Sequence, residues 1–341
     1  MTAAMDRPGE AASAHPEVGA GTARAEPGRW TRGHLTLGHY PDGPIQSPVN
    51  ILSGTQPGKV LWIQNAVHGD EPGGAIGILR FLKHCDPSTM AGTIVAVMAA
   101  NPTAFRAQAR NTPCDSENMN RCFPGGKGGG HTRAAAGVLL DTACSVADAV
   151  VDLHSGGIDA VVPFYSIYCN DGSAAAEESL RLARATGTPT IWACRDQWLD
   201  GAFFSNAVKR NKPAVLVECG GGGPVPEEHV ENFARAIEGI ARAMGILPGR
   251  PAPAPRYRTI DGCSIVHNQR GGYFEPDVRA GDIVAAGQVL GRILSPHGEV
   301  LEELVSPVGP AYVASILRAF LPVHSGIEVA ETIRISDRLT A

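Results

Sequence analysis

Short apolar runs alternate with amphipathic segments through the middle of the chain. Brief, continuous apolar runs predict buried strands at 60–66, 93–99, 148–153, 164–168, 189–193 and 213–218. Apolar positions that recur with helical spacing predict helices at 74–84, 133–146, 174–186 and 227–244. This alternation predicts an α/β domain over 30–247, with a mixed central sheet flanked by helices.

The two ends of the chain follow other patterns. Residues 1–29 are rich in Ala, Gly, Pro and Glu and lack the apolar core of a secretory signal, so we expect a disordered tail. Residues 30–57 predict short strands and turns, with a turn cluster at 40–44. The stretch 248–255 is proline-rich and predicts a linker. Residues 256–341 carry turn signals at short, regular intervals and predict a small all-β module.

Composition narrows the classes of function. The net charge is -5 and basic residues do not cluster, so neither nucleic acid nor an anionic membrane surface is an expected partner. No apolar segment reaches the roughly 18 residues that a membrane-spanning helix needs. The eight cysteines form no CxxC pair, which in a chain of 341 residues indicates reduced thiols and a cytoplasmic location.

Two strand ends carry metal-binding residue types. His68 and Glu71 lie three residues apart on a predicted strand-to-helix turn, where an imidazole and a carboxylate can share one cation. The apolar run 150–153 ends at His154, which is the best candidate for a third ligand. Two histidines, one glutamate and a position open to water form the ligand set of a catalytic zinc ion, one per subunit.

A general base is expected at the end of a third strand. Glu218 follows the apolar run 214–217, where partial desolvation raises a carboxyl pKa toward the working range. The neighbouring Cys219 is a weaker candidate nucleophile, because no orienting histidine adjoins it.

Polar residues between these strands suggest how a substrate is held. Arg121 beside Asn120 suits a clamp for a substrate carboxylate, since a guanidinium binds carboxylates through two hydrogen bonds. Arg110 suits polarisation of a scissile carbonyl. From its spacing alone, however, we favour the interpretation that Arg110 is a loop arginine paired on the surface.

The order of these motifs resembles the succinylglutamate desuccinylase/aspartoacylase family, relatives of the zinc carboxypeptidases. The resemblance covers about 34–245 and rests on the sequences His-Gly-Asp-Glu, Asn-Arg-x-Phe-Pro-Gly, Asp-Leu-His and Val-Glu-Cys-Gly, which occupy positions 68–71, 120–125, 152–154 and 217–220. Within the family the chain is most similar to N-acetyl-diaminobutyrate deacetylases.

The resemblance implies a zinc-carboxypeptidase-like fold and a role for each matched residue. His68, Glu71 and His154 match the zinc ligands, and Glu218 matches the glutamate that activates the attacking water. Less closely matched, Arg110 corresponds to the arginine that faces the scissile carbonyl. Asn120 and Arg121 match the pair that holds the substrate's carboxylate.

The chain departs from the aspartoacylase branch at two points. Asn118 stands where that branch has an aspartate expected to orient a zinc histidine, so an amide carbonyl, or Asp115 or Glu117, would have to accept that hydrogen bond. A further arginine upstream of the catalytic glutamate has no aligned counterpart, since Lys209 and Arg210 are only near it. Specificity for a dicarboxylic substrate is therefore not implied.

The C-terminal module resembles a barrel-sandwich, lipoyl-like domain over 276–291. No lysine follows Lys212, so covalent attachment of lipoyl or biotin there is excluded. We expect the module to cap the active site or to form a contact in a homo-oligomer.

Together with the resemblance, these residues favour a zinc-dependent amidohydrolase that removes an acyl group, expected to be acetyl, from a small N-acyl amino acid such as N-acetyl-diaminobutyrate. One alternative is a zinc carboxypeptidase acting on short peptides, which a module folded over the active-site mouth would disfavour. Another is a non-catalytic binding protein of the same fold.

Overall fold

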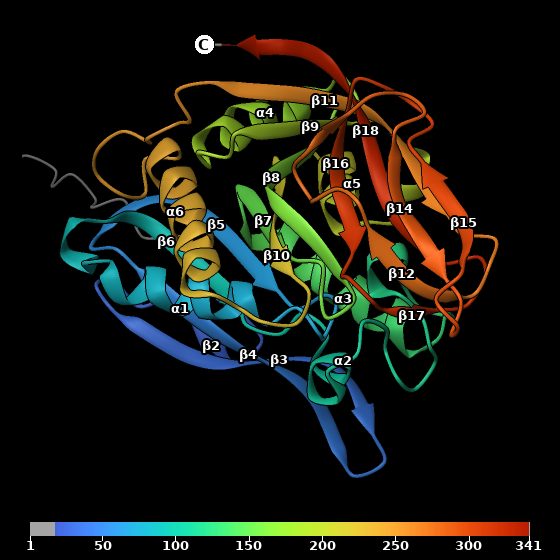
Figure 1. Ribbon diagram of the computed structural model, residues 1–341. Helices are drawn as coiled ribbons and strands as arrows, with labels where there is room; N and C mark the ends of the chain where they lie inside the picture. The colour runs from blue at the N-terminus through green and yellow to red at the C-terminus, as the bar shows by residue number, and fades with distance from the viewer. Residues whose placement is uncertain (1–17, 341) are drawn as a thin grey trace, which may run out of the picture.

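The computed structural model describes residues 18–340 (Figure 1). Two short strands, β1 (Gly19–Ala20) and β2 (Ala23–Arg24), pair near the N-terminus, and the side chains of Val18, Ala20 and Ala23 are buried. The prediction of a disordered tail over 1–29 is therefore wrong for residues 18–29, whose few apolar side chains pack into the core. The rest of that predicted tail lies outside the described residues.

Every strand and helix predicted between 60 and 247 is present. The strands are β5 (Gln56–Asn65), β6 (Ala91–Val97), β7 (Ala149–His154), β8 (Ala160–Cys169), β9 (Thr190–Cys194) and β10 (Ala214–Gly221). The predicted helices are α1 (Gly73–His84), α3 (His131–Val146), α4 (Ala174–Ala185) and α6 (Glu227–Ala243). The prediction missed two shorter helices, α2 (Pro102–Ala107) and α5 (Phe203–Lys209).

The segment before β5 is more regular than the predicted short strands. It forms two long antiparallel strands, β3 (Trp30–Tyr40) and β4 (Gly43–Ser53), which turn at the predicted cluster 40–44. β4 continues the sheet by pairing with β6.

The central sheet is mixed, as predicted. β6, β5, β7 and β10 run parallel, so their carboxyl ends meet at one edge, whereas β8 pairs antiparallel with β10. Alternate residues of β5 face opposite sides: Leu61 and Ile63 pack with α1, α4 and α6, and Trp62 packs with α3 and α5. The helices thus cover both faces and leave the strand ends free to hold a site (Figure 1).

The C-terminal region is all-β, as predicted, and it is joined to the central sheet. Its strands are β11 (Tyr257–His267), β12 (Gly272–Pro276), β13 (Ile283–Val284), β14 (Val289–Leu294), β15 (Val300–Val305), β16 (Ala311–Leu317), β17 (Pro322–Val323) and β18 (Glu328–Thr340). β11 pairs parallel with β9, and β16 pairs with β8. A four-stranded sheet of β15, β14, β12 and β17 packs on these strands around Phe274 and Ile293.

Candidate active site

The turn between β5 and α1 presents His68 and Glu71. Ala66 opens this turn with a positive φ of 57°, a conformation that costs energy for a residue with a Cβ. Gly69 follows His68 and lies so close to α2 that a Cβ there would sit 2.0 Å from the carbonyl carbon of Ala104. The local backbone is therefore constrained to hold His68 and Glu71 at the strand end.

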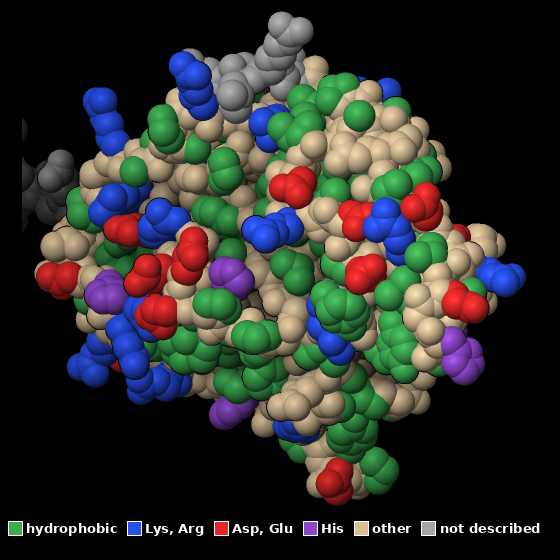
Figure 2. Space-filling model, viewed as in Figure 1, with side chains coloured by type: hydrophobic (Ala, Val, Ile, Leu, Met, Phe, Trp, Pro, Cys, Tyr) green, Lys and Arg blue, Asp and Glu red, His purple; other side chains and the backbone are tan. Residues whose placement is uncertain are grey.

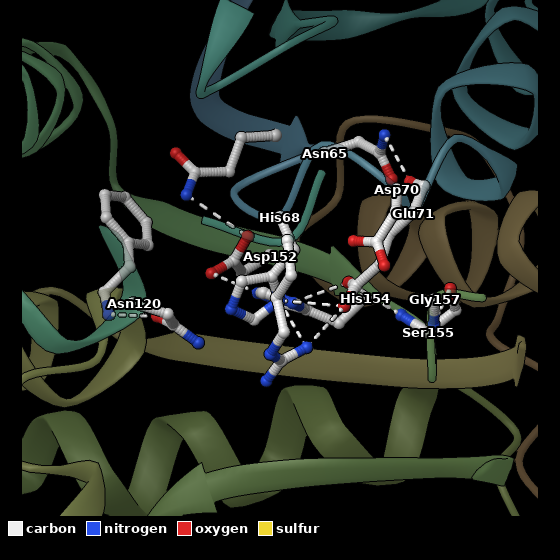
Figure 3. Close-up of polar contacts among 12 residues, drawn as sticks. Asn65, His68, Asp70, Glu71, Asn120, Asp152, His154, Ser155 and Gly157 are labelled. Atoms are coloured by element: carbon white, nitrogen blue, oxygen red, sulfur yellow. Dashed lines mark hydrogen bonds and ion pairs between the residues drawn. The ribbon is translucent and has the colours of Figure 1, made fainter. Parts of the chain in front are cut away.

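Glu71 lies between the two histidines (Figure 3). Its Oε1 is 2.8 Å from Nδ1 of His68, and its Oε2 is 2.9 Å from Nδ1 of His154. All three side chains are at least 97% buried, and one ligand atom from each lies within 4.8 Å of the other two. The structure thus brings His154, 83 residues away in the chain, into coordinating reach of Glu71 and His68.

The outer nitrogen of each histidine meets an oxygen. Nε2 of His68 is 3.1 Å from Oδ1 of Asn118, and Nε2 of His154 is 3.1 Å from Oδ2 of Asp152. Gln64 donates in turn to Oδ1 of Asp152, at 3.2 Å. Such contacts fix the ring orientation and keep Nδ1 of each ring directed toward Glu71, where it can act as a metal ligand.

Asn118, rather than its acidic neighbours, accepts from His68. Asp115 instead binds the backbone and hydroxyl of Thr132 at the start of α3, and Glu117 pairs with Arg133. Neither carboxylate is therefore placed to accept the hydrogen bond from His68 that the aspartate accepts in the aspartoacylase branch. The histidine is oriented by a neutral amide.

The protonation of His68, Glu71 and His154 depends on their burial and on the charged groups beside them. Burial and then the nearby Arg110 lower the pKa of His68 to about 4, so this ring is neutral. Burial opposes ionisation of Glu71, but the two imidazoles outweigh it and lower its pKa. Despite burial, Asp152 and Glu71 raise the pKa of His154. Only a neutral imidazole and an ionised carboxylate bind a cation, so a cation would have to displace a proton from His154.

Glu218 faces the cluster from β10. It pairs in register with His154 on the neighbouring parallel strand β7, so both side chains leave the sheet at the same edge. Its Oε2 is buried and has no hydrogen-bond partner within the described part of the chain. Burial raises the pKa of Glu218 to about 8, which allows the carboxyl group to take up and release a proton near neutrality.

The arginines predicted from sequence also reach the site. Arg110 is not paired on the surface: its Nη1 lies 3.2 Å from Glu71 and 3.3 Å from Nδ1 of His68. The guanidinium of Arg121 stacks 4.7 Å from the ring of Trp198. Asn120 is buried, and its Oδ1 accepts from the backbone of Phe203, which leaves its amide NH₂ as the free donor.

One cavity of about 370 Å³ joins these residues. It is lined by all the predicted site residues and, in addition, by a set that sequence reasoning did not identify, including Asp159, Tyr165, Trp192, Trp198, Glu328 and Glu331. No local motif marks the last two, because only tertiary contacts bring the C-terminal strands to the site.

A larger groove of about 810 Å³ lies elsewhere, between α1 and α6. Charged side chains of both signs gather over these helices (Figure 2). Arg80 pairs there with Glu227, and Arg242 pairs with Glu238. These ion pairs neutralise charges of both signs on the surface, and the groove contains none of the predicted site residues that line the smaller cavity.

Asp70 and Cys219, two polar residues next to the predicted site residues, have structural rather than chemical roles. Asp70 accepts weakly from the backbone of Ile158, at 3.4 Å, and so braces the turn after β7. Cys219 is buried, and burial raises its thiol pKa to about 11, so it is a poor nucleophile. All eight cysteines are free thiols, as predicted.

The fold and the site together define an enzyme of the hydrolase class, with a buried His-Glu-His cluster and a protonatable glutamate at the strand ends of an α/β domain. The sequence profile of the succinylglutamate desuccinylase/aspartoacylase catalytic domain matches residues 57–244. The chain belongs to this family and is a hydrolase acting on N-acyl amino acids.

Individual relatives agree with this assignment. The chain is 30% identical over 259 residues to an N-alpha-acetyl-L-2,4-diaminobutyric acid deacetylase of Halomonas elongata, which covers 74% of this chain and 75% of the relative. Its fold is similar to that of a succinylglutamate desuccinylase from a Silicibacter species, with a TM-score of 0.80, 24% identity and coverage of 90% and 95% of the two chains. Its fold is also similar to that of the product-bound ectoine utilization protein EutE from Ruegeria pomeroyi. Here the TM-score is 0.80, the identity is 23%, and the match covers 90% of this chain and 95% of the other.

None of the helices in residues 18–340 combines the length and apolar character needed to cross a bilayer.

Proposed function

We propose that this enzyme is a zinc-dependent deacylase that hydrolyses the amide bond of a small N-acetylated amino acid, such as N-acetyl-diaminobutyrate. The observation that carries the proposal is the convergence of His68, Glu71 and His154 with Glu218 in one cavity. The catalytic domain, 30–247, would then be zinc-carboxypeptidase-like, followed by the linker 248–255 and the module 256–341. We place the enzyme in the cytoplasm.

The residues fit a divalent ion. Two imidazole nitrogens and a carboxylate are the protein ligands of many catalytic zinc sites, and here they converge within 4.8 Å. When bound, such an ion supplies Lewis-acid chemistry, making water acidic near neutral pH and polarising a carbonyl oxygen. Asn118 and Asp152 would hold the two imidazoles as ligands.

Glu218 would move the proton. Its carboxylate takes a proton from the attacking water, and the resulting carboxylic acid returns that proton to the nitrogen of the departing amine. A pKa of about 8 suits both transfers, because neither the base nor the acid form is excluded near neutral pH.

Three polar residues would place the substrate. Arg110, close to Glu71, would stabilise the oxygen of the tetrahedral intermediate. Arg121, held by stacking on Trp198, would bind the substrate's carboxylate, with the amide of Asn120 as a second donor. The acetyl group is proposed because the Halomonas relative is named as a deacetylase.

A carboxypeptidase acting on short peptides is the second candidate, since it needs the same chemistry. Strands β16 and β18 line the cavity, which favours a small substrate over a peptide. Faster removal of a C-terminal residue from a tetrapeptide than of acetyl from acetylated amino acids would reverse this preference.

The test of the proposed base is Glu218→Gln, with the exposed Glu228→Gln as control. We expect the first variant to retain zinc by elemental analysis while its kcat falls by about 100-fold or more, since general-base catalysis contributes ~10²–10⁴. The control should keep its kcat. A Glu218→Gln enzyme with full metal content and near-normal turnover would end the proposal, and inactivity of the zinc-loaded wild type on every acyl amino acid would favour a non-catalytic binding protein.

A further inference from the structure

The C-terminal strands contribute two carboxyl groups to the wall of the catalytic cavity. Glu328 and Glu331, both on β18, line the same cavity as His68, Glu71 and Glu218. Neither glutamate belongs to the motifs of the catalytic domain, and neither has a role in the proposed proton transfer.

A local irregularity of β18 turns both glutamates to the cavity. Residues three apart in a regular strand point to opposite faces. The pairing of β18 with β11 shifts between Glu328 and Ala330, and such a bulge adds one residue and re-aims the side chains that follow. Ser315, in register with Glu331 on β16, lines the cavity beside it.

The two carboxyl groups lack a basic partner. They hydrogen-bond to each other, and within residues 18–336 no arginine, lysine or histidine forms an ion pair with either one. Arg121 interacts with them electrostatically, but its guanidinium stacks on Trp198. Glu331 is partly buried and Glu328 is exposed, so a cation can reach both carboxyl groups.

Other polar atoms in the cavity independently indicate a bound ligand. Trp192 is only 1% exposed, and among the residues that the structure describes its indole nitrogen, that of Trp198 and Oε2 of Glu218 have no hydrogen-bond partner. All three side chains line the cavity. Since buried polar groups are normally hydrogen-bonded, three unsatisfied ones around one cavity mark a site for a polar ligand.

We propose, building on the proposed hydrolysis of N-acyl amino acids, that Glu328 and Glu331 form a subsite for a positively charged amino group of the substrate. An ammonium group offers three donors and would hydrogen-bond to both carboxyl groups. Arg121 across the cavity would bind the substrate's carboxylate. The C-terminal module therefore selects N-acyl diamino acids over N-acyl amino acids with neutral side chains.

The test compares two ligands that differ only in charge. N-alpha-acetyl-2,4-diaminobutyrate carries an ammonium where N-acetylnorvaline carries a methyl group. We expect Glu331→Gln and Glu328→Gln to lower kcat/KM for the diamine substrate by about 10- to 100-fold, the worth of a charged hydrogen bond, and to change that for acetylnorvaline by less than about threefold. Glu331→Asp should restore part of the loss. Glu299→Gln, exposed in the same module, is the control.

A binding measurement separates this proposal from the catalytic one. Calorimetry should show that the zinc-loaded wild type binds free 2,4-diaminobutyrate more tightly than norvaline, and that Glu331→Gln loses the difference. Equal binding of the two amino acids, or equal losses on both substrates, overturns the subsite even if hydrolysis is intact. Selective binding without any hydrolysis supports the subsite and refutes the proposed function.

Discussion

At the scale of single residues, the side chains of His68, Glu71 and His154 are each fixed by contacts with more than one neighbour. The two histidines direct Nδ1 toward Glu71 and Nε2 toward Asn118 or Asp152. Ser155 donates its backbone N–H to Oε2 of Glu71, at 3.0 Å, which keeps that carboxylate between the rings. The geometry for binding a cation is thus set by the protein itself, which lowers the entropy lost on binding.

A substitution at Asp152 tests whether its contact with His154 strengthens metal binding. Asp152→Asn removes the charge that faces His154, so we expect zinc affinity to fall by about 10- to 100-fold, as for other residues that contact metal ligands. Competition with a chelator of known affinity measures the change. Asp42→Asn, exposed in the β3–β4 turn, should leave the affinity unchanged. Equal affinities in wild type and Asp152→Asn would show that the contact does not support the ligand.

At the scale of elements, the turn after β5 depends on close backbone approach to α2. Gly69 donates its N–H to the carbonyl of Ala109, and its α-carbon faces the backbone of Ala104. The turn must therefore shift if a larger residue replaces this glycine, and His68 would shift with it.

Gly69→Ala should therefore weaken both folding and metal binding. We expect a loss of about 1–3 kcal/mol in the free energy of unfolding, typical of overpacking, and a weaker affinity for zinc. Urea denaturation and chelator competition measure the two effects. Gly271→Ala is the control, because the nearest atom to its added Cβ lies 3.3 Å away and its φ is not positive. An unchanged midpoint in Gly69→Ala would contradict the packing argument.

At the scale of the whole molecule, one sheet extends through the catalytic domain and the C-terminal region. β11 and β18 continue it beyond β9, and β16 returns to β8 beside the cavity. The C-terminal region therefore forms part of the wall of the candidate active site. The capping role expected from the sequence stays a prediction.

Zinc should stabilise the whole chain through this site. A ligand that binds only the folded state adds about 4 kcal/mol of stability at 1,000 times its dissociation constant, so we expect zinc to raise Tm clearly in wild type. His154→Ala should lose most of this rise, and His297→Ala, exposed in the C-terminal region, should retain it. Scanning calorimetry with and without a chelator measures the shift. A rise of equal size in His154→Ala would place the stabilising ion elsewhere.

The sequence alone predicted the strands from β5 to β10 and the four longer helices, and it named the residues that the structure brings together in one cavity. Continuous apolar runs define buried strands, and polar residues at their carboxyl ends predict a shared site because parallel strands end at one edge. His68, Glu71, His154 and Glu218 could therefore be predicted together, and the role of Asn118 as a neutral acceptor could be anticipated from its carbonyl.

Only the tertiary structure decided which residues complete the cavity. α2 and α5 are too short for a clear periodic signal, and residues 18–29 owe their order to packing. Glu328 and Glu331 come from a strand whose local pattern is ordinary, and a bulge together with the pairing of β16 and β8 brings them to the site. Such placement depends on contacts between distant segments, which the local pattern of a chain does not encode.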